Sequence, residues 1–226
     1  QYIGDPVNTI KIFNDKEVDE IVVLDINASK KGTEPDYQLI EEMVSQAFMP
    51  IAYGGGIKTF EQAQRVFNTG VEKIIINSAA LNNSELIEKI AYHYGAQSVA
   101  LAVDVKKSLF TGYKIYEHVQ NKTSYVSLKK YLSMINTDTV GELLVNNVDR
   151  EGTFNGYDLD LAKEIQSALN IPVVMCGGAR ELEDFSKIKK IGLSGAAAGS
   201  MFIYKRSKTH NAVLINYPDY NSLENL

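Results

Sequence analysis

The sequence predicts an α/β fold in which strands and helices alternate along the chain and form a (β/α)8 barrel. Short apolar runs alternate with amphipathic stretches, glycines follow several of these runs, and the chain contains an internal repeat. A length of 226 residues suits such a barrel. We therefore expect residues 1–226 to form a single barrel domain.

The composition is that of a soluble globular protein, with 45% apolar and 23% charged residues. The net charge of −5 is not accompanied by a basic stripe, which argues against a nucleic-acid partner. No apolar run approaches the roughly 18 residues needed to span a membrane, and no signal segment is visible. The single cysteine, Cys176, cannot form an internal disulfide, which fits a reducing cytoplasm.

The first predicted helix follows Asp5, an N-cap residue, and has Pro6 at its first position; we expect it to end near residue 13. Residues 20–25 are mostly β-branched and predict a buried strand. Further strands are expected at residues 49–53, 73–76, 99–105, 142–147, 172–176 and 195–198. Further helices are expected at residues 36–47, 59–68, 84–92, 127–135, 158–169 and 181–188. The stretch GYKIYEHVQ, within residues 107–126, interrupts this rhythm and predicts part of a β-hairpin.

This alternation predicts a parallel sheet with helices outside it, but it supplies seven strand–helix units rather than eight. An open doubly wound sheet is the alternative, although no G-x-G-x-x-G turn follows the first strand. The barrel is favoured, and we expect an initial strand to be missing ahead of Gln1.

The internal repeat appears when the sequence is shifted by 122 positions, which places PIAYGGGIKTFEQA on PVVMCGGARELEDF. The shift aligns Pro50 with Pro172, and it also aligns the pairs Gly55–Gly56 and Gly177–Gly178, Gly70 and Gly192, and Ser78 and Ser200. A half-barrel used twice explains this pattern.

The repeated glycines predict two anion sites. Gly55–Gly56 and Asn77–Ser78 end neighbouring strands, as do Gly177–Gly178 and Gly199–Ser200. Backbone N–H groups at such strand ends, beside helix N-termini, are suited to phosphate. The alternative is that the glycines only make tight turns, but the recurrence with serine at the same spacing favours phosphate. Two such sites indicate a long substrate with a phosphate at each end.

Asp104 is the candidate catalytic residue, because it ends the run SVALAVD at the expected mouth of the barrel. Its alternative role is to cap the following turn. Asn147, Asp149, Glu151 and Gly152 lie in or beside the loop VDREGTFNGYD and are predicted to bind substrate, although Asp149 could simply brace that loop.

No histidine is placed to activate Cys176, so we expect neither a thiol nucleophile nor a metal site, and no cofactor. His93 and His210 lie in a helix and in the tail, where we expect structural or solvated roles. Glu20, Lys73 and Glu142 each stand at the start of a strand; they are either exposed edge charges or a ring around an opening.

Several motifs, in order along the chain, resemble the cyclase subunit of imidazole glycerol phosphate synthase: LDINAS, GGGIKTFEQA, IINSAA, AVDVK, NNVDREGTFNGYD, GGARELEDF and AAAGSMF. The resemblance covers residues 4 to about 202, and the DREGT-x-x-GYD loop with both glycine sites makes it specific. The sister isomerase of histidine biosynthesis shares the repeat but fits this loop less well.

The resemblance implies a (β/α)8 barrel that acts on a ribulose-bearing bisphosphate and receives ammonia from a glutaminase partner through the barrel. It implies that Asp104 is the fifth-strand catalytic acid. It also implies that the glycine and serine positions hold phosphate and that Glu20, Lys73 and Glu142 belong to a charged gate at the ammonia entrance. The family's other catalytic aspartate and the fourth gate residue, an arginine, would lie on the missing first strand.

The chain departs from the family pattern at Cys176, where a serine is usual, at Asn146, where a threonine is usual, and at Glu151, where an aspartate is usual. The tail HNAVLINYPDY resembles a paralogous branch that serves lipopolysaccharide and O-antigen pathways. That branch works with a glutaminase and a third, amidotransferase-like protein to form acetamidino groups on sugars. The alternative function is therefore a non-cyclising subunit that conveys ammonia.

Overall fold

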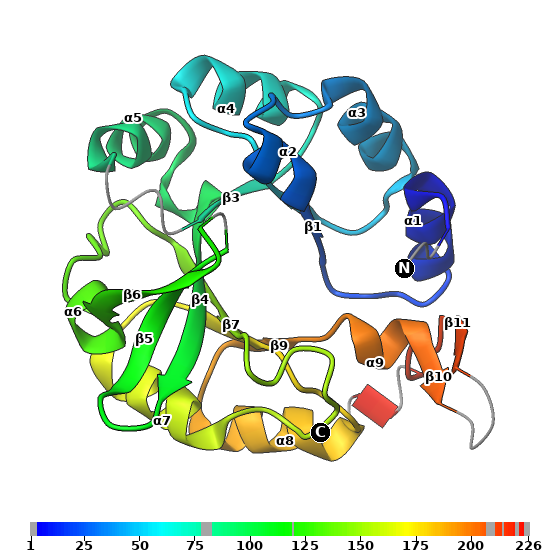
Figure 1. Ribbon diagram of the computed structural model, residues 1–226. Helices are drawn as coiled ribbons and strands as arrows, with labels where there is room; N and C mark the ends of the chain where they lie inside the picture. The colour runs from blue at the N-terminus through cyan, green and yellow to red at the C-terminus, as the bar shows by residue number, and fades with distance from the viewer. Residues whose placement is uncertain are drawn as a thin grey trace. The chain divides into compact units, whose positions relative to one another are not determined.

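The computed structural model describes residues 4–77, 83–118, 120–206, 211–213, 215–219 and 222–223. The chain divides into two compact units. Unit 1 comprises Gln1–Leu101 and Asp138–Gly141, and unit 2 comprises Ala102–Thr137 and Glu142–Leu226. Each unit is built from parallel strands that alternate with helices (Figure 1).

Unit 1 contains three neighbouring parallel strands in the order β1-β2-β3. Helices α3, α4 and α5 follow one another along one side of these strands (Figure 1). Its elements are α1 (Pro6–Asn14), β1 (Ile21–Leu24), α2 (Ile26–Lys31), α3 (Tyr37–Gln46), β2 (Ile51–Gly54), α4 (Phe60–Asn68), β3 (Lys73–Asn77), α5 (Ser84–Tyr94) and the 3-10 turn η2 (Ala96–Ser98).

Unit 2 has the strand order β4-β7-β8-β9, and an antiparallel hairpin extends from β4. Strand β4 (Val99–Ser108) begins in unit 1 and continues into unit 2. The other elements are β5 (Gly112–Glu117), β6 (Lys122–Ser127), α6 (Leu128–Leu132), β7 (Glu142–Asn147), α7 (Leu159–Ala168), β8 (Val173–Cys176), α8 (Leu182–Ile191), β9 (Gly195–Ala197), α9 (Ser200–Ile203), β10 (Tyr204–Arg206) and β11 (Asn211–Val213).

The 122-residue repeat is reproduced in the strand registers. Ala52 pairs with Lys73 in unit 1, and Val174 pairs with Gly195 in unit 2. Likewise, Ile21 pairs with Ile51, and Leu143 pairs with Val173. All four positions of unit 1 are offset by 122 from their counterparts in unit 2, so one supersecondary pattern occurs twice.

Helix starts repeat in the same way. Asp36 accepts a hydrogen bond from Leu39 N at the start of α3, and Asp158 accepts one from Leu161 N at the start of α7. Helices α4 and α8 both begin with a capping box, made by Thr59 and Gln62 in one unit and by Glu181 and Asp184 in the other. These caps satisfy backbone N–H groups that a helix start leaves without partners.

The core of each unit is formed by the strands and the inward faces of the helices. In unit 1, aromatic rings join α4 to α5: Phe67 stacks on Tyr94 with 4.0 Å between centroids, and Phe60 lies 4.6 Å from His93. The His93 ring therefore packs against a neighbouring helix, which is one of the roles expected for it. His210 lies outside the described residues.

The fold class is confirmed, since the order of elements and the parallel pairing are those of a (β/α)8 barrel. One detail is wrong: residues 20–25 form a strand but not a buried one, because Val22 is 36% and Leu24 is 50% exposed. Strand β1 ends the strand path, so β2 is its sole neighbour in the described sheet. The sequence also failed to predict five short elements, α2, η2, α9, β10 and β11. Helix α6 ends at Leu132, before residue 135.

Candidate functional site

Asp104 is a buried carboxyl group in β4, with 7% of the residue exposed. Its Oδ1 accepts a hydrogen bond of 2.8 Å from Asn146 Nδ2 in β7, and His118 Nε2 lies 3.2 Å from the same oxygen. Because two nitrogens converge on one oxygen, the carboxyl group has a defined orientation. This arrangement suits a group that transfers protons.

A pocket in unit 2 brings together six of the twelve predicted substrate- and phosphate-binding residues. Its walls include Glu151 and Gly152 from the loop after β7, Gly177 and Gly178 after β8, and the segment 197–201 that contains Gly199 and Ser200. An added Cβ on Gly152 would lie 4.0 Å from Ser200 Oγ, so the serine hydroxyl lies across the pocket from that loop. The serine and the glycine pair thus share one cavity, as the spacing predicted.

The glycines of this pocket also have a structural reason to be glycine. Gly177 has a φ of +94° and Gly178 a φ of +101°, where residues with a side chain are strained. A Cβ on Gly177 would lie 2.7 Å from Asn147 O, and one on Gly178 would lie 2.4 Å from Gly156 O. The loop after β7 therefore packs directly on the glycine backbone, and the tight turn and the pocket wall are formed by the same residues.

The pocket places Glu151 within electrostatic reach of Asp104. Partial loss of hydration raises the pKa of Glu151, the Gly152 backbone N–H opposes this shift, and the Asp104 carboxylate adds to it. A bound dianion would favour the protonated form of Glu151 still further. The protonated carboxyl group can donate a hydrogen bond to a phosphate oxygen, so an acid here is compatible with an anionic ligand.

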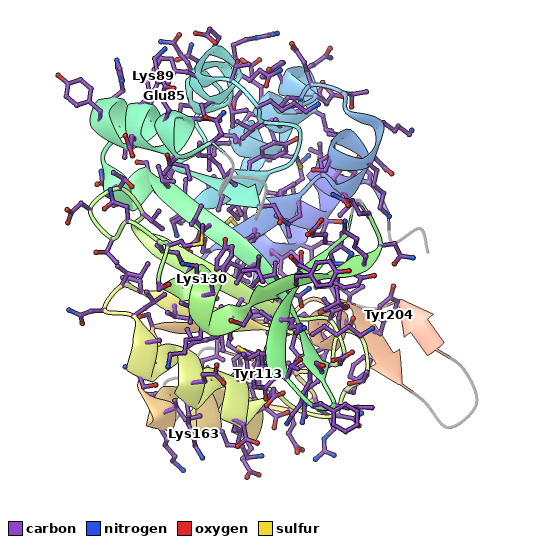
Figure 2. The ribbon with its side chains drawn as sticks, turned by 60° about the vertical axis from the view of Figure 1, so that its left-hand side comes forward. Glu85, Lys89, Tyr113, Lys130, Lys163 and Tyr204 are labelled. Carbon is purple, nitrogen blue, oxygen red and sulfur yellow. The ribbon has the colours of Figure 1, made fainter. Side chains whose placement is uncertain are left out.

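Asn147 ends β7, and Asp149 lies near the start of the loop that follows it. Asn147 is 1% exposed and donates from Nδ2 to Asp158 Oδ2 at 3.0 Å, while Asp149 Oδ2 accepts the Lys107 N–H at 2.8 Å. Asp158 also accepts hydrogen bonds of 2.9 Å from the hydroxyl of Tyr113, which is labelled on β5 in Figure 2. Both residues line a separate cavity of about 340 Å³, and their observed contacts hold the loop in place.

Unit 1 carries the counterpart of the glycine turn. Gly55 has a φ of +130° and its Cβ would lie 2.4 Å from Asp25 O, the equivalent of the contact between Gly177 and Asn147. Gly56 is likewise left-handed, at +72°, and Asn77 ends β3. Ser78, predicted to complete this site, lies outside the described residues.

Two of the three predicted gate residues are in contact. Lys73 at the start of β3 donates to both carboxylate oxygens of Glu20, at 3.0 and 3.1 Å, beside the start of β1. The side chain of Lys73 is only 17% exposed and that of Glu20 is 32% exposed. The pair is therefore not a simple surface ion pair. Glu142 occupies the position in unit 2 that Glu20 occupies in unit 1, at the start of β7.

Cys176 ends β8, and its thiol is expected to be unreactive. Burial raises the pKa of this thiol to about 12, and the Glu151 carboxylate adds to the shift. We expect iodoacetamide at pH 8 to leave the native protein unmodified and to alkylate it after unfolding in urea, because the thiolate is the reactive form. Mass spectrometry gives a direct readout, since this is the single cysteine of the chain. Rapid alkylation of the native protein would contradict the prediction.

Two residues that touch Asp104, Asn146 and His118, carry no functional role predicted from the sequence. Asn146 was noted only as a departure from a family pattern, although strand alternation could have placed its side chain on the opposite face from Asn147. His118 was not considered, because its approach to Asp104 depends on the pairing of the hairpin. No local sequence signal marks that contact.

Comparison with known proteins decides the family. The family described as "Histidine biosynthesis protein" matches residues 1–208. The chain belongs to this histidine biosynthesis protein family. A relative in Leptospira interrogans, provisionally named imidazole glycerol phosphate synthase subunit HisF, is 45% identical over 228 residues, which covers 100% of this chain and 89% of the relative.

Two further members of the histidine biosynthesis family extend the comparison. A protein of Pseudomonas aeruginosa, provisionally named imidazole glycerol phosphate synthase subunit hisF2, is 42% identical over 99% of this chain and 89% of its own length. The imidazole glycerol phosphate synthase subunit HisF of Petrotoga mobilis is 39% identical over 89% of this chain and 80% of its own length. The resemblance predicted from the motifs is confirmed at the level of the family.

Membrane-spanning helices and metal-binding clusters are both absent from the described residues. None of the helices in the described ranges combines the length and apolar character needed to cross a membrane. In the same ranges, no three His, Cys, Asp or Glu side chains gather into a set that could hold a metal ion.

Proposed function

We propose that this protein is the ammonia-accepting cyclase subunit of an imidazole glycerol phosphate synthase, working in the cytoplasm with a glutaminase. The observation that carries the proposal is the pocket in which Gly177–Gly178, Gly199–Ser200 and Glu151–Gly152 meet, within electrostatic reach of Asp104. The relatives that carry the same subunit name support this assignment.

The substrate in this proposal is a bisphosphate that bears a ribulose group. One phosphate is held at Gly177–Gly178 and Ser200 by backbone N–H groups and a hydroxyl, and the other at Gly55–Gly56, Asn77 and Ser78. Binding at both ends would fix the reactive centre, which lowers the entropic part of the barrier. The repeated register supports two sites of the same construction.

In the reaction, ammonia attacks the ribulose carbonyl, and Asp104 moves protons during the following lyase and cyclisation steps. Its burial and its two nitrogen neighbours hold the carboxyl group in one orientation, which suits proton transfer. A route that excludes water keeps ammonia in its neutral, nucleophilic form.

The test is to mix the full natural protein with the bisphosphate substrate and ammonium salt, and to assay for imidazole glycerol phosphate. Product formation without any glutaminase is the expected result. Absence of product, with the protein shown to be folded by circular dichroism, would contradict the cyclase assignment.

A non-cyclising ammonia conduit is the second candidate function. It is favoured by the C-terminal tail HNAVLINYPDY, whose sequence resembles that of the paralogous branch. In the structure, Asn216 N donates to Phe202 O at 2.7 Å and the Tyr217 ring packs on the Phe202 ring, so this part of the tail lies against α9. In this alternative, ammonia passes to a third, amidotransferase-like protein that modifies lipopolysaccharide sugars, and the same assay distinguishes the two functions.

The ion pair of Lys73 and Glu20 is proposed to form, with Glu142, a gate for ammonia. We expect Lys73→Met to lower glutamine-dependent turnover in the complex about tenfold, while turnover with free ammonium changes less than about twofold. Lys163→Met is the matched control, because Lys163 is exposed on α7 (Figure 2). Equal losses in both assays for Lys73→Met would refute the gate.

A further inference from the structure

His118 occupies an unusual position between a buried carboxyl group and solvent. It follows β5 in the hairpin turn, with its Nε2 3.2 Å from Asp104 Oδ1. The Asp104 side chain is 11% exposed, whereas that of His118 is 49% exposed. The imidazole therefore contacts the buried acid through one nitrogen while much of the ring faces water.

The hairpin accounts for this position. The register pairs Val105 with Ile115, so Asp104 lies opposite Tyr116. His118 comes two residues after Tyr116, just beyond the end of β5. Because side chains alternate along a strand, His118 continues the face that carries Tyr116. The Tyr116 ring meets the His118 ring edge-on, with 4.9 Å between centroids and an interplanar angle of 88°. Tyr116 is itself held by a hydrogen bond from its hydroxyl to Asn121 Oδ1 across the turn. The imidazole thus packs against an anchored ring and is not a freely rotating surface side chain.

The charges and polar groups around the contact favour proton exchange. Asn146 Nδ2 donates to the same Asp104 oxygen, which leaves the carboxyl group oriented even when the histidine loses a proton. On the hairpin side, the Lys106 ammonium lies 5.6 Å above the Tyr116 ring and 3.9 Å from Asp149. Burial is the main cause of the raised pKa values of Tyr131 and Glu151, and the Asp104 carboxylate raises both pKa values further. The Asp104 carboxyl group is largely enclosed, and the half-exposed His118 ring that contacts it connects it to solvent.

We propose that His118 is the proton-exchange and positioning partner of Asp104, an inference that rests on the proposed cyclase function. A proton taken up by Asp104 passes to Nε2 of the neutral ring that carries its hydrogen on Nδ1. This step leaves a carboxylate beside an imidazolium, whose Nε2–H then donates to Asp104 Oδ1. The imidazolium releases its Nδ1 proton to water. The reverse sequence recharges Asp104 when it must act as an acid.

The test compares His118→Gln and His118→Ala in the full natural protein, with ammonium and bisphosphate as substrates. Glutamine keeps an N–H donor but cannot ionise, and alanine leaves space that free imidazole can enter. We expect kcat to fall at least about tenfold in both variants, with little change in KM for the bisphosphate. Added imidazole should restore much of kcat in the alanine variant and none in the glutamine variant. His93→Gln is the control, since His93 contacts Lys89 O in α5 and should keep wild-type kcat.

The possible outcomes separate the inference from the function. Wild-type kcat in His118→Gln would overturn proton exchange while the cyclase assignment stands. Failure of imidazole to restore the alanine variant would also overturn it, provided circular dichroism shows a native fold; if that variant does not fold, the glutamine variant decides. A wild-type protein that makes no product would remove the proposed function, and this inference with it.

Discussion

Asp104→Asn is expected to lower kcat for the ammonium-dependent reaction by about 10²–10⁴-fold, the usual contribution of a general acid or base. Asparagine has the same shape, and its Oδ1 can still accept the hydrogen bond that Asn146 donates to Asp104 at 2.8 Å. The substitution therefore removes the proton-transfer group while leaving the local geometry in place. We expect the loss to appear in kcat more than in KM for the bisphosphate.

The matched control is Asp160→Asn, which removes an exposed carboxylate from the first turn of α7. It should leave turnover within about twofold of wild type, since surface charges of this kind contribute little. Thermal unfolding of both variants would show whether any loss reflects folding. Near-normal turnover in folded Asp104→Asn would refute the assignment of Asp104 as the catalytic acid.

Gly177→Ala should destabilise the protein by about 3 kcal/mol, one of the largest effects available to a single methyl group. The new Cβ would lie 2.7 Å from Asn147 O, at a φ of +94° that strains a residue with a side chain. Since the obstacle is backbone of the neighbouring strand end, it cannot move without disturbing β7. Urea denaturation followed by circular dichroism measures the free energy of unfolding.

Gly112→Ala separates the two causes of this loss. Gly112 also has a positive φ, of +72°, but a Cβ there would have no atom within 4 Å. Its expected loss is about 1 kcal/mol, which reflects the left-handed conformation alone. If Gly177→Ala and Gly112→Ala lower the free energy of unfolding equally, the close approach of the new Cβ to Asn147 O does not contribute to the loss. Gly55→Ala, with Asp25 O at 2.4 Å, should repeat the larger effect in unit 1.

The repeat was the most informative feature of the sequence, because it determines structure at many positions together. Once residues 50–63 align with residues 172–185, the glycine turns and the helices after them must recur. The registers of β2 with β3 and of β8 with β9 carry the same offset of 122. The turns at the strand ends can also be predicted from the glycine pairs themselves, since few other residues accept a positive φ.

Other features could not be predicted, either because the local helix propensity is weak or because they depend on contacts between distant segments. The helix α2 has the sequence INASKK, whose asparagine and serine are weak helix formers; Asp25 caps its start and Gly32, at a φ of +71°, ends it. His118 reaches Asp104 because β5 pairs with β4, and an irregularity between Lys114 and Tyr116 shifts the pairing of β5 with β6. Neither the bulge nor the turn could be placed from periodicity.

The most direct test of the central claim is a crystal structure of the full natural protein soaked in phosphate. The account predicts two bound phosphates. One should contact the backbone of Gly177–Gly178 with Ser200 Oγ, and the other the backbone of Gly55–Gly56 beside Asn77. Empty glycine turns in both units, with Ser200 Oγ directed away from Gly152, would contradict the proposal that this chain holds a bisphosphate at both ends.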